Sequence, residues 1–127
     1  MASVLIIEDE PSILKFLSQN LALRGWDVLV ATDGAEGLQH ALQEQTDLIM
    51  LDLMLPVMSG WDVLRRLDKE GVLRHVPVIV VTAASREEDE RRARCLGATD
   101  YLVKPFGVPE MLRRISAIVP VTARQAT

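Results

Sequence analysis

The sequence predicts an α/β domain in which an open parallel β-sheet carries helices on both faces. Short continuous apolar runs recur along the chain without the in–out alternation of a half-exposed strand, and such runs suit strands that are covered on both faces. Segments with the apolar spacing of helices lie between these runs. Strands that alternate with helices imply βαβ units with right-handed crossovers, which place helices on the two faces of one sheet.

Five apolar runs are the predicted strands of this sheet. Each is short, as the strands of a parallel sheet are, and is followed by polar or turn-forming residues. The last run is the weakest of the set. The runs are VLII (4–7), VLVA (28–31), LIML (48–51), VIVV (78–81) and YLV (101–103).

The helices between these strands have recognisable end signals. Pro11 suits the first turn of a helix, and Asp33 and Ser59 can each cap a helix by accepting a hydrogen bond from a free backbone N–H group. The fourth helix has its acidic residues in the first turns and its arginines later, which suits the helix dipole. The predicted helical segments are 11–25, 33–45, 59–71, 85–97 and the segment that follows Pro109.

Four of these helices have an apolar face that can pack on the sheet. The residues predicted to face inward are Ile13, Leu14, Leu17 and Leu21; Leu38, Ala41 and Leu42; Trp61, Val63, Leu64 and Leu67; and Met111, Leu112, Ile115 and Ile118.

Length and composition indicate one globular domain. The chain has 127 residues, of which 49% are hydrophobic and 25% are charged, so neither disorder nor a fibrous repeat is expected. We expect the domain to cover residues 1–119 and residues 120–127 to form a tail or the start of a linker. The formal charge of −4 and the absence of a basic patch from the sequence argue against nucleic-acid binding by this domain.

The sequence favours a cytoplasmic location. Cys95 is the only cysteine, so we expect no internal disulfide and a reducing compartment, with Cys95 as a small core residue on a helix. The N-terminal stretch MASVLIIEDE has no basic region before its apolar residues and differs from a signal peptide. No apolar run approaches the roughly 18 residues of a membrane span, so no membrane association is expected.

Polar side chains follow four of the predicted strands. The first strand is followed by Glu8, Asp9 and Glu10. The third strand is followed by Asp52, the fourth by Thr82 and the fifth by Lys104. Each residue alone is more simply a cap, a turn residue or a surface charge. Ligands of open parallel sheets bind at the carboxyl ends of the strands, so the joint placement of these groups indicates a site.

The acids of this set predict a magnesium site. If Glu8, Asp9 and Asp52 converge, two unit charges about 5 Å apart repel each other by around 3 kcal/mol at an effective dielectric of about 20. A hard divalent cation removes this cost, and Mg²⁺ favours carboxylates with waters and phosphate oxygens. The set contains no histidine or cysteine, which argues against zinc.

The remaining polar groups indicate phosphoryl chemistry. Lys104 is a point charge that can meet an anionic ligand, and the Thr82 hydroxyl can donate a hydrogen bond to one of its oxygens. Phosphoryl transfer depends mainly on positioning and charge neutralisation. Asp52 is therefore the candidate nucleophile.

At this point the sequence resembles the receiver domains of two-component response regulators. The resemblance covers about residues 3–119 and rests on IIEDE (6–10), LDLMLPVMSG (51–60), VIVVTA (78–83) and GATDYLVKPF (97–106). It implies a flavodoxin-like doubly wound sheet of five parallel strands in the order 2-1-3-4-5 with five helices, an architecture for which a member of this family is a standard example.

The resemblance also implies a function for the polar groups. Asp52 is similar to the aspartate that accepts a phosphoryl group from a histidine kinase or a histidine phosphotransfer protein. Asp9, Asp52 and the backbone carbonyl of Met54 resemble the ligands of Mg²⁺, for which Mn²⁺ can substitute, and Glu8 assists through water. Such a domain catalyses its own phosphorylation and is not an enzyme with turnover.

Further residues resemble the switch of these receivers. Thr82 and Lys104 match the pair that contacts the phosphoryl oxygens, and the resemblance implies a cis Lys104–Pro105 peptide. Tyr101 matches the aromatic residue that turns inward when Thr82 moves toward the phosphate, although its position alone also fits a half-buried aromatic on an edge strand. The switching face would be helix 4, strand 5 and helix 5 (85–118), through which the protein binds partners or forms a homodimer.

The motifs LDLMLP and DYLVKPF favour the branch of transcription factors with a winged-helix output domain, or a stand-alone receiver. Asp100 and Arg114 resemble an interface ion pair of that branch. Glu90 would not pair with Glu110, which argues against the dimerisation mode of that branch. The side chains of Met54 and Ala84, two residues beyond Asp52 and Thr82, cannot guide an attacking water, so we expect no fast autodephosphorylation.

Three other functions remain alternatives. The first is a receiver that binds proteins without phosphorylation, which the complete set of polar groups disfavours. The second is an aspartyl-phosphate hydrolase, which would have an acid where this chain has Met54. The third, a dinucleotide-binding enzyme, is weakest, because the turn after the first strand is acidic and lacks a glycine-rich fingerprint.

Overall fold

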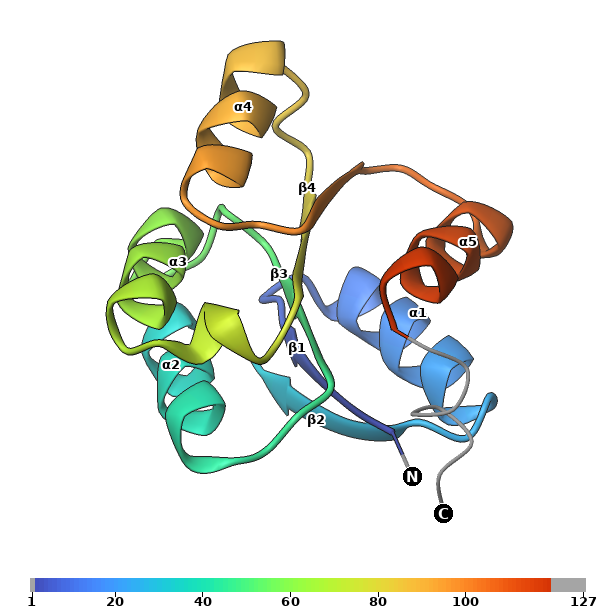
Figure 1. The fold of residues 1–127 in the computed structure, drawn as a ribbon. Helices are drawn as coiled ribbons and strands as arrows, with labels where there is room; N and C mark the ends of the chain where they lie inside the picture. The colour runs from blue at the N-terminus through green and yellow to red at the C-terminus, as the bar shows by residue number, and fades with distance from the viewer. Residues whose placement is uncertain (1, 120–127) are drawn as a thin grey trace.

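The computed structural model describes residues 2–119, which form one five-stranded parallel sheet with helices on both faces (Figure 1). The strand order is β2-β1-β3-β4-β5, so the predicted order is confirmed. The predicted tail or linker at 120–127 lies outside the described residues. The elements are β1 (Ser3–Ile7), α1 (Pro11–Ala22), β2 (Asp27–Ala31), α2 (Gly34–Gln43), β3 (Leu48–Leu51), α3 (Gly60–Lys69), the 3₁₀ turn η1 (Val72–Arg74), β4 (Val78–Thr82), α4 (Glu87–Cys95), β5 (Asp100–Val103) and α5 (Val108–Ile118).

All five predicted strands are present, and their burial explains the apolar runs. Every residue of β3 and β4 is buried, because helices cover both faces of these central strands. The edge strand β2 is only partly buried. The registers align Ile7 with Leu51 and Leu51 with Val80, so the carboxyl ends of β1, β3 and β4 lie side by side.

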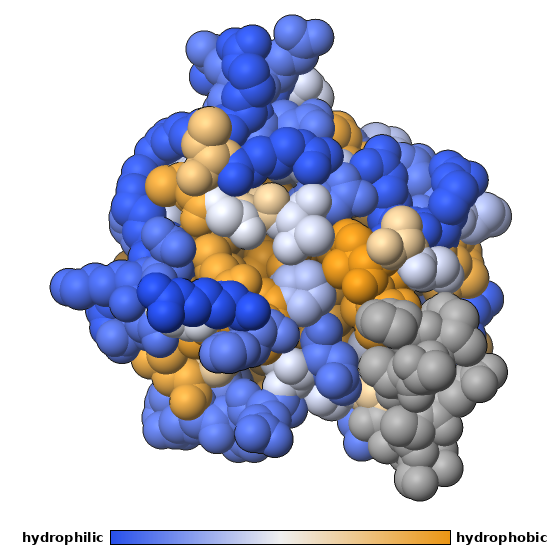
Figure 2. All heavy atoms as spheres, viewed as in Figure 1, coloured by the Kyte–Doolittle hydropathy of each residue, from blue (hydrophilic) through white to orange (hydrophobic). Residues whose placement is uncertain are grey.

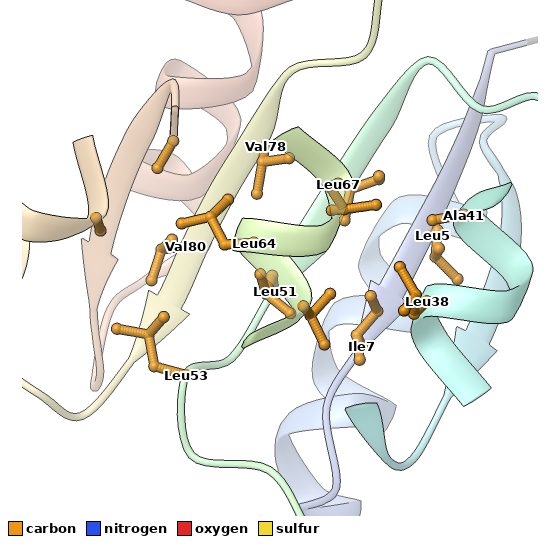
Figure 3. Close-up of a cluster of buried hydrophobic side chains, with 14 of the residues drawn as sticks. Leu5, Ile7, Leu38, Ala41, Leu51, Leu53, Leu64, Leu67, Val78 and Val80 are labelled. Atoms are coloured by element: carbon orange, nitrogen blue, oxygen red, sulfur yellow. The ribbon is translucent and has the colours of Figure 1, made fainter. Parts of the chain in front are cut away.

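Two apolar layers hold the helices to the sheet. One layer joins α2 and α3 to one face of β1, β3 and β4, and Figure 3 shows its side chains meeting between these elements. The other layer joins α1 and α5 to the opposite face, and these two helices lie together on that side of the sheet in Figure 1. Burial of these side chains stabilises the fold by about 25 cal/mol per Å² of apolar surface.

The helix ends follow the predicted signals with small shifts. The side chain of Asp33 accepts a hydrogen bond from the backbone N–H of Glu36 at the start of α2, and Ser59 caps α3 in the same way. The first helix ends at Ala22, and Gly25 adopts a φ of 87° in the turn beyond it. That left-handed conformation favours glycine because it lacks a Cβ.

Two predictions about single side chains are wrong. Leu42 is 43% exposed, because the buried stripe of α2 follows Gly34, Gly37, Leu38 and Ala41 and Leu42 lies at its margin. Cys95 is exposed, because α4 buries only Ala93 and is polar around the rest of its circumference. Figure 2 shows α4, at the top of the view, covered by hydrophilic side chains.

None of the helices within residues 2–119 combines the length and the apolar character that crossing a bilayer requires.

Candidate functional site

The carboxyl edge of the sheet brings together the polar residues that follow the strands. Glu8 and Asp9 follow β1, Asp52 follows β3, Thr82 ends β4 and Lys104 follows β5. The strands are parallel, so their carboxyl ends share one edge of the sheet. A cleft of about 440 Å³ opens there, and it is lined by Asp9, Glu10, Pro11, Asp52, Met54, Ala83 and Lys104.

Three carboxylates converge in this cleft. One oxygen from each of Glu8, Asp9 and Asp52 lies within 4.8 Å of the other two. Glu8 and Asp52 are only 1% and 4% exposed, whereas Asp9 is exposed. Burial raises the pKa of Glu8 to about 7, since removal from water disfavours the charged form. An oxygen-only set of this kind fits a hard divalent cation such as Mg²⁺ and not a soft metal.

Lys104 lies among the same carboxylates. Its Nζ atom is 2.6 Å from Oε1 of Glu8 and 3.0 Å from Oδ2 of Asp52. Burial alone would lower the pKa of Lys104, but the hydrogen bonds to Glu8 and Asp52 raise it above its ordinary value. The ammonium group therefore stays charged and offsets part of the repulsion between the acids.

The main chain fixes Asp52 and Lys104 in place. The backbone N–H of Met54 donates to Oδ1 of Asp52 at 3.0 Å, so one carboxylate oxygen of Asp52 is held by the chain and the other by Lys104. The backbone N–H of Lys104 donates to the carbonyl of Thr82 at 2.9 Å. The Lys104–Pro105 peptide is cis.

Thr82 and Tyr101 both contact Ala84, in the loop between β4 and α4. Thr82 is fully buried, and its Oγ1 accepts a hydrogen bond from the Ala84 N–H at 3.4 Å. The Tyr101 hydroxyl donates to the Ala84 carbonyl at 2.6 Å. Tyr101 is only 3% exposed, and burial raises its pKa to about 12, so it remains a donor. Ala84 thus connects the end of β4 to the buried aromatic ring.

Asp100 and Arg114 form an ion pair within one chain. Arg114 Nη1 is 2.8 Å from Oδ1 of Asp100, and Arg94 Nη2 is 2.9 Å from the same oxygen. Arg94 also pairs with Glu90 at 3.0 Å, and Arg114 lies 3.6 Å from Glu110. An ion-pair network of five side chains therefore connects α4, β5 and α5 inside the molecule.

Sequence reasoning missed the contacts of two residues. Glu10 looked like a solvated residue at a helix entry, but its Oε2 lies 3.6 Å from Lys104 Nζ. The position of Glu10 directly after Asp9, at the end of the same strand, could have indicated this contact. Arg94 looked like one of several arginines on α4, and only the packing of α4 beside β5 shows that it meets Asp100.

Fold and site together define a doubly wound α/β domain with a cleft of carboxylates and one lysine at the switch point of its sheet. The family model that matches is the response regulator receiver domain, over residues 4–116. The chain belongs to this family and is a receiver domain of two-component response regulators.

Curated relatives are transcriptional regulators. The chain is 44% identical to the DNA-binding dual master transcriptional regulator RpaA of Synechocystis sp., over 98% of this chain and 52% of that protein. It is 46% identical to the transcriptional regulatory protein KdpE of Mycobacterium tuberculosis, over 94% of this chain and 51% of that protein. The chain thus spans about half the length of the curated relatives it matches.

Solved receiver structures share the fold. The receiver domain of the Francisella response regulator 1452 has a TM-score of 0.86 at 30% identity, covering 93% of this chain and 96% of that one. The receiver domain of the sensor histidine kinase PA1611 from Pseudomonas aeruginosa has a TM-score of 0.84 at 29% identity, covering 92% of this chain and 96% of that one. In that structure a magnesium ion is coordinated in the active-site cleft.

Proposed function

We propose that Asp52 accepts a phosphoryl group from a histidine kinase or a histidine phosphotransfer protein. The observation that carries this proposal is the placement of the Asp52 carboxylate at the cleft, with Lys104 Nζ 3.0 Å from Oδ2 and two further acids beside it. A carboxylate with a neighbouring cation is a suitable nucleophile, because transfer depends on positioning and charge neutralisation. Like its relatives, the protein acts in signalling, and the reaction modifies the protein itself without turnover of a substrate.

The proposal includes a divalent cation, Mg²⁺ or Mn²⁺. Asp9, Asp52 and the backbone carbonyl of Met54 would hold it, with Glu8 assisting through water. The three carboxylate oxygens within 4.8 Å support this set. When bound, the cation neutralises charge on the transferring phosphoryl group and on the acids around it.

The protein groups have distinct functions in the transfer. A carboxylate oxygen of Asp52 attacks phosphorus, the bond to the leaving group breaks, and an aspartyl phosphate forms. Lys104 leaves its carboxylate partners to contact a phosphoryl oxygen, and the Thr82 hydroxyl donates to another. Neither Met54 nor Ala84 has a side chain that can guide an attacking water, so the phosphoryl group is expected to persist for longer than seconds.

The same proposal explains how the signal leaves the site. The phosphoryl group carries about −1.5 to −2 charges and strong acceptor oxygens, which draw the Thr82 hydroxyl toward the phosphate. The Ala84 N–H then loses its side-chain acceptor, and the loop carbonyl that holds the Tyr101 hydroxyl shifts. We expect this shift to alter the face formed by α4, β5 and α5, and with it partner binding or homodimerisation.

We base the proposed output of this receiver on the names of its relatives. Their names describe transcriptional regulators, so this receiver would control a transcriptional output without contacting DNA or a membrane itself. Both phosphorylation by the kinase and control of the transcriptional output would take place in the cytoplasm. A homodimer that uses Asp100 and Arg114 between chains would first have to open the ion pair that joins them within one chain.

Incubation with acetyl phosphate and Mg²⁺, followed by intact-mass measurement, tests the proposal. Wild-type protein should gain the mass of one phosphoryl group, and Asp52→Asn should gain none. Asp68→Asn, an exposed acid on α3, is the matched control and should be modified like wild type. Equal modification of the Asp52→Asn variant would overturn the proposal.

A further inference from the structure

Glu10 occupies the mouth of the cleft above Asp52. Its side chain is 57% exposed, whereas that of Lys104 is 11% exposed and that of Asp52 is 5% exposed. The Oε2 atom of Glu10 lies 3.6 Å from Lys104 Nζ. Glu10 is therefore an outer carboxylate on the same ammonium group that Glu8 and Asp52 hold from inside.

The carboxylate of Glu10 has no structural task in the helix that it precedes. Glu10 is the N-cap residue of α1, but within residues 2–119 its side chain makes no capping hydrogen bond. Its backbone fixes its place instead: its N–H donates to Oε2 of Glu8 at 3.1 Å, and its carbonyl accepts from the N–H of Leu14. The backbone of Glu10 is thus fixed beside the cleft, and its side chain is one of those that line it.

The other charged residues that line the cleft, Asp9, Asp52 and Lys104, already have functions in the proposed transfer, and the remaining lining residues, Pro11, Met54 and Ala83, are uncharged. Glu10 is therefore the lining carboxylate to which the proposed function gives no part. A partly exposed carboxylate acts on charged ligands through a largely aqueous medium, so its effect is moderate and depends on salt.

We propose that Glu10 sets the phosphodonor preference of this receiver by disfavouring donors with greater negative charge. The inference rests on the proposed function of Asp52 as phosphoacceptor. Glu10 acts on the approach of the donor and restrains Lys104; it takes no part in bond making, so it is a specificity residue.

Two small donors that deliver the same group isolate this effect. With acetyl phosphate, which carries two negative charges, an Asp52 oxygen bonds to phosphorus, the anhydride P–O bond breaks and acetate leaves with one negative charge. With zwitterionic phosphoramidate, which carries one net negative charge, the P–N bond breaks and neutral ammonia leaves. Both reactions give the same aspartyl phosphate, and the intrinsic reactivity of each donor is the same for every variant. A change in the ratio of the two rate constants between wild type and a variant therefore reports on the interaction of the protein with each donor.

The experiment measures the phosphorylation rate constants of both donors, by intact mass in Mg²⁺, for wild type, Glu10→Gln and Glu10→Lys. Relative to phosphoramidate, acetyl phosphate should gain about threefold in Glu10→Gln, as expected for one unit charge about 6–7 Å away in a water-like dielectric. The gain should be larger in Glu10→Lys and should shrink in high salt. Glu70→Gln is the matched control, because it removes an exposed acid at the far end of α3.

A second readout needs no donor. Calorimetric titration with Mg²⁺ should give nearly the same affinity for Glu10→Gln as for wild type, and the NMR signal of the Lys104 ammonium should shift in the metal-free variant. More than tenfold weaker Mg²⁺ binding would make Glu10 a metal ligand and overturn the inference. An unchanged donor ratio in Glu10→Gln and Glu10→Lys would overturn it too, whereas wild type that accepts phosphate from neither donor would overturn the function assigned to Asp52.

Discussion

At the scale of single residues, Gly60 shows how tightly the chain is packed behind Asp52. Gly60 is buried at the start of α3, and its N–H donates to the Leu53 carbonyl at 3.0 Å. A Cβ at position 60 would collide with the backbone carbonyl of Asp52 and lie 2.5 Å from the Leu53 Cα. Both contacts are with backbone, so neither can be relieved by rotating a side chain, and the position of Asp52 depends on this glycine.

Gly60→Ala should therefore lower the free energy of unfolding by about 2 kcal/mol or more, the cost of overpacking a rigid site. It should also slow phosphorylation, because the backbone of Asp52 must move. Urea denaturation and the acetyl phosphate assay measure the two effects. Gly107→Ala is the control, since a Cβ there meets only Pro109 at 3.5 Å. Equal stability of the two variants would contradict this view of Gly60.

At the scale of elements, charged side chains connect α4 and α5 to β5. Asp100 is the central group, because its Oδ1 accepts from Arg94, Arg114 and the N–H of Tyr101. Burial alone would raise the pKa of Asp100, but these three donors lower it below its ordinary value of 3.8. A lowered pKa in the folded state means that ionised Asp100 stabilises the fold.

Asp100→Asn should lower the free energy of unfolding at pH 7 by about 1.5 kcal/mol, the lower end of the range for hydrogen bonds to a charged group, because asparagine keeps one acceptor oxygen. This contribution is fully present above the ordinary pKa and disappears as pH falls through the lowered pKa of the folded state. The difference between variant and wild type should thus shrink below pH 3.8. Urea denaturation at several pH values measures this difference in the free energy of unfolding, and Asp68→Asn is the control. A difference that grows in acid would show that ionised Asp100 does not stabilise the fold.

The helix α4 depends on polar contacts more than the other helices do. It buries only Ala93, and short helices without an apolar face are marginal in water. The guanidinium of Arg92 lies 4.1 Å from the centroid of the Trp61 ring on α3, and Arg94 contacts β5 on the other side. Two arginines therefore hold α4 between its neighbours.

Arg92→Ala should lower the free energy of unfolding by about 0.5–1 kcal/mol, the strength of an exposed cation–π contact. Amide hydrogen exchange in α4 should become faster, because the contact with α3 is lost while the core is intact. Tryptophan fluorescence should also change through Trp61. Arg91→Ala is the control, because it removes an exposed neighbour on the same helix. It should leave the stability, the amide exchange and the fluorescence close to those of wild type. Similar effects in the two variants would contradict the importance of the Trp61 contact.

At the scale of the whole molecule, the sheet concentrates negative charge at one edge. Four acids lie there, Glu8, Asp9, Glu10 and Asp52, and among residues 2–119 Lys104 is the one ammonium group that pairs with them. A cation that binds between them would relieve this repulsion only in the folded state, because Asp52 lies more than 40 residues from the acids at 8–10 and joins them only when the sheet forms. Metal binding and global stability are therefore coupled.

Mg²⁺ at a hundredfold excess over its dissociation constant should raise the free energy of unfolding by about 2.7 kcal/mol. In Asp9→Asn most of this gain should disappear, whereas Glu70→Gln should keep it. Thermal unfolding with and without Mg²⁺ measures the gain. A similar Mg²⁺ effect in Asp9→Asn and wild type would show that the cation binds elsewhere.

The predicted elements were confirmed because local patterns determine them. Each of the five continuous apolar runs forms a strand. Asp33 and Ser59 cap helices because their side-chain oxygens can accept a hydrogen bond from a backbone N–H three residues later. The exposures of Leu42 and Cys95 were wrong, since they depend on how each helix is rotated against the sheet. Local spacing cannot fix that rotation for a helix such as α4, which has few apolar residues.

The sequence by itself determined the α/β class, the strands and the polar residues at their ends, because hydrophobic periodicity and strand direction are local properties. Tertiary structure alone decided which of those residues touch. It placed Lys104 against Glu8, Asp52 and Glu10, and Asp100 between Arg94 and Arg114. These contacts join different strands and helices, and their distances depend on how the sheet twists and how each loop is packed, which no local pattern encodes.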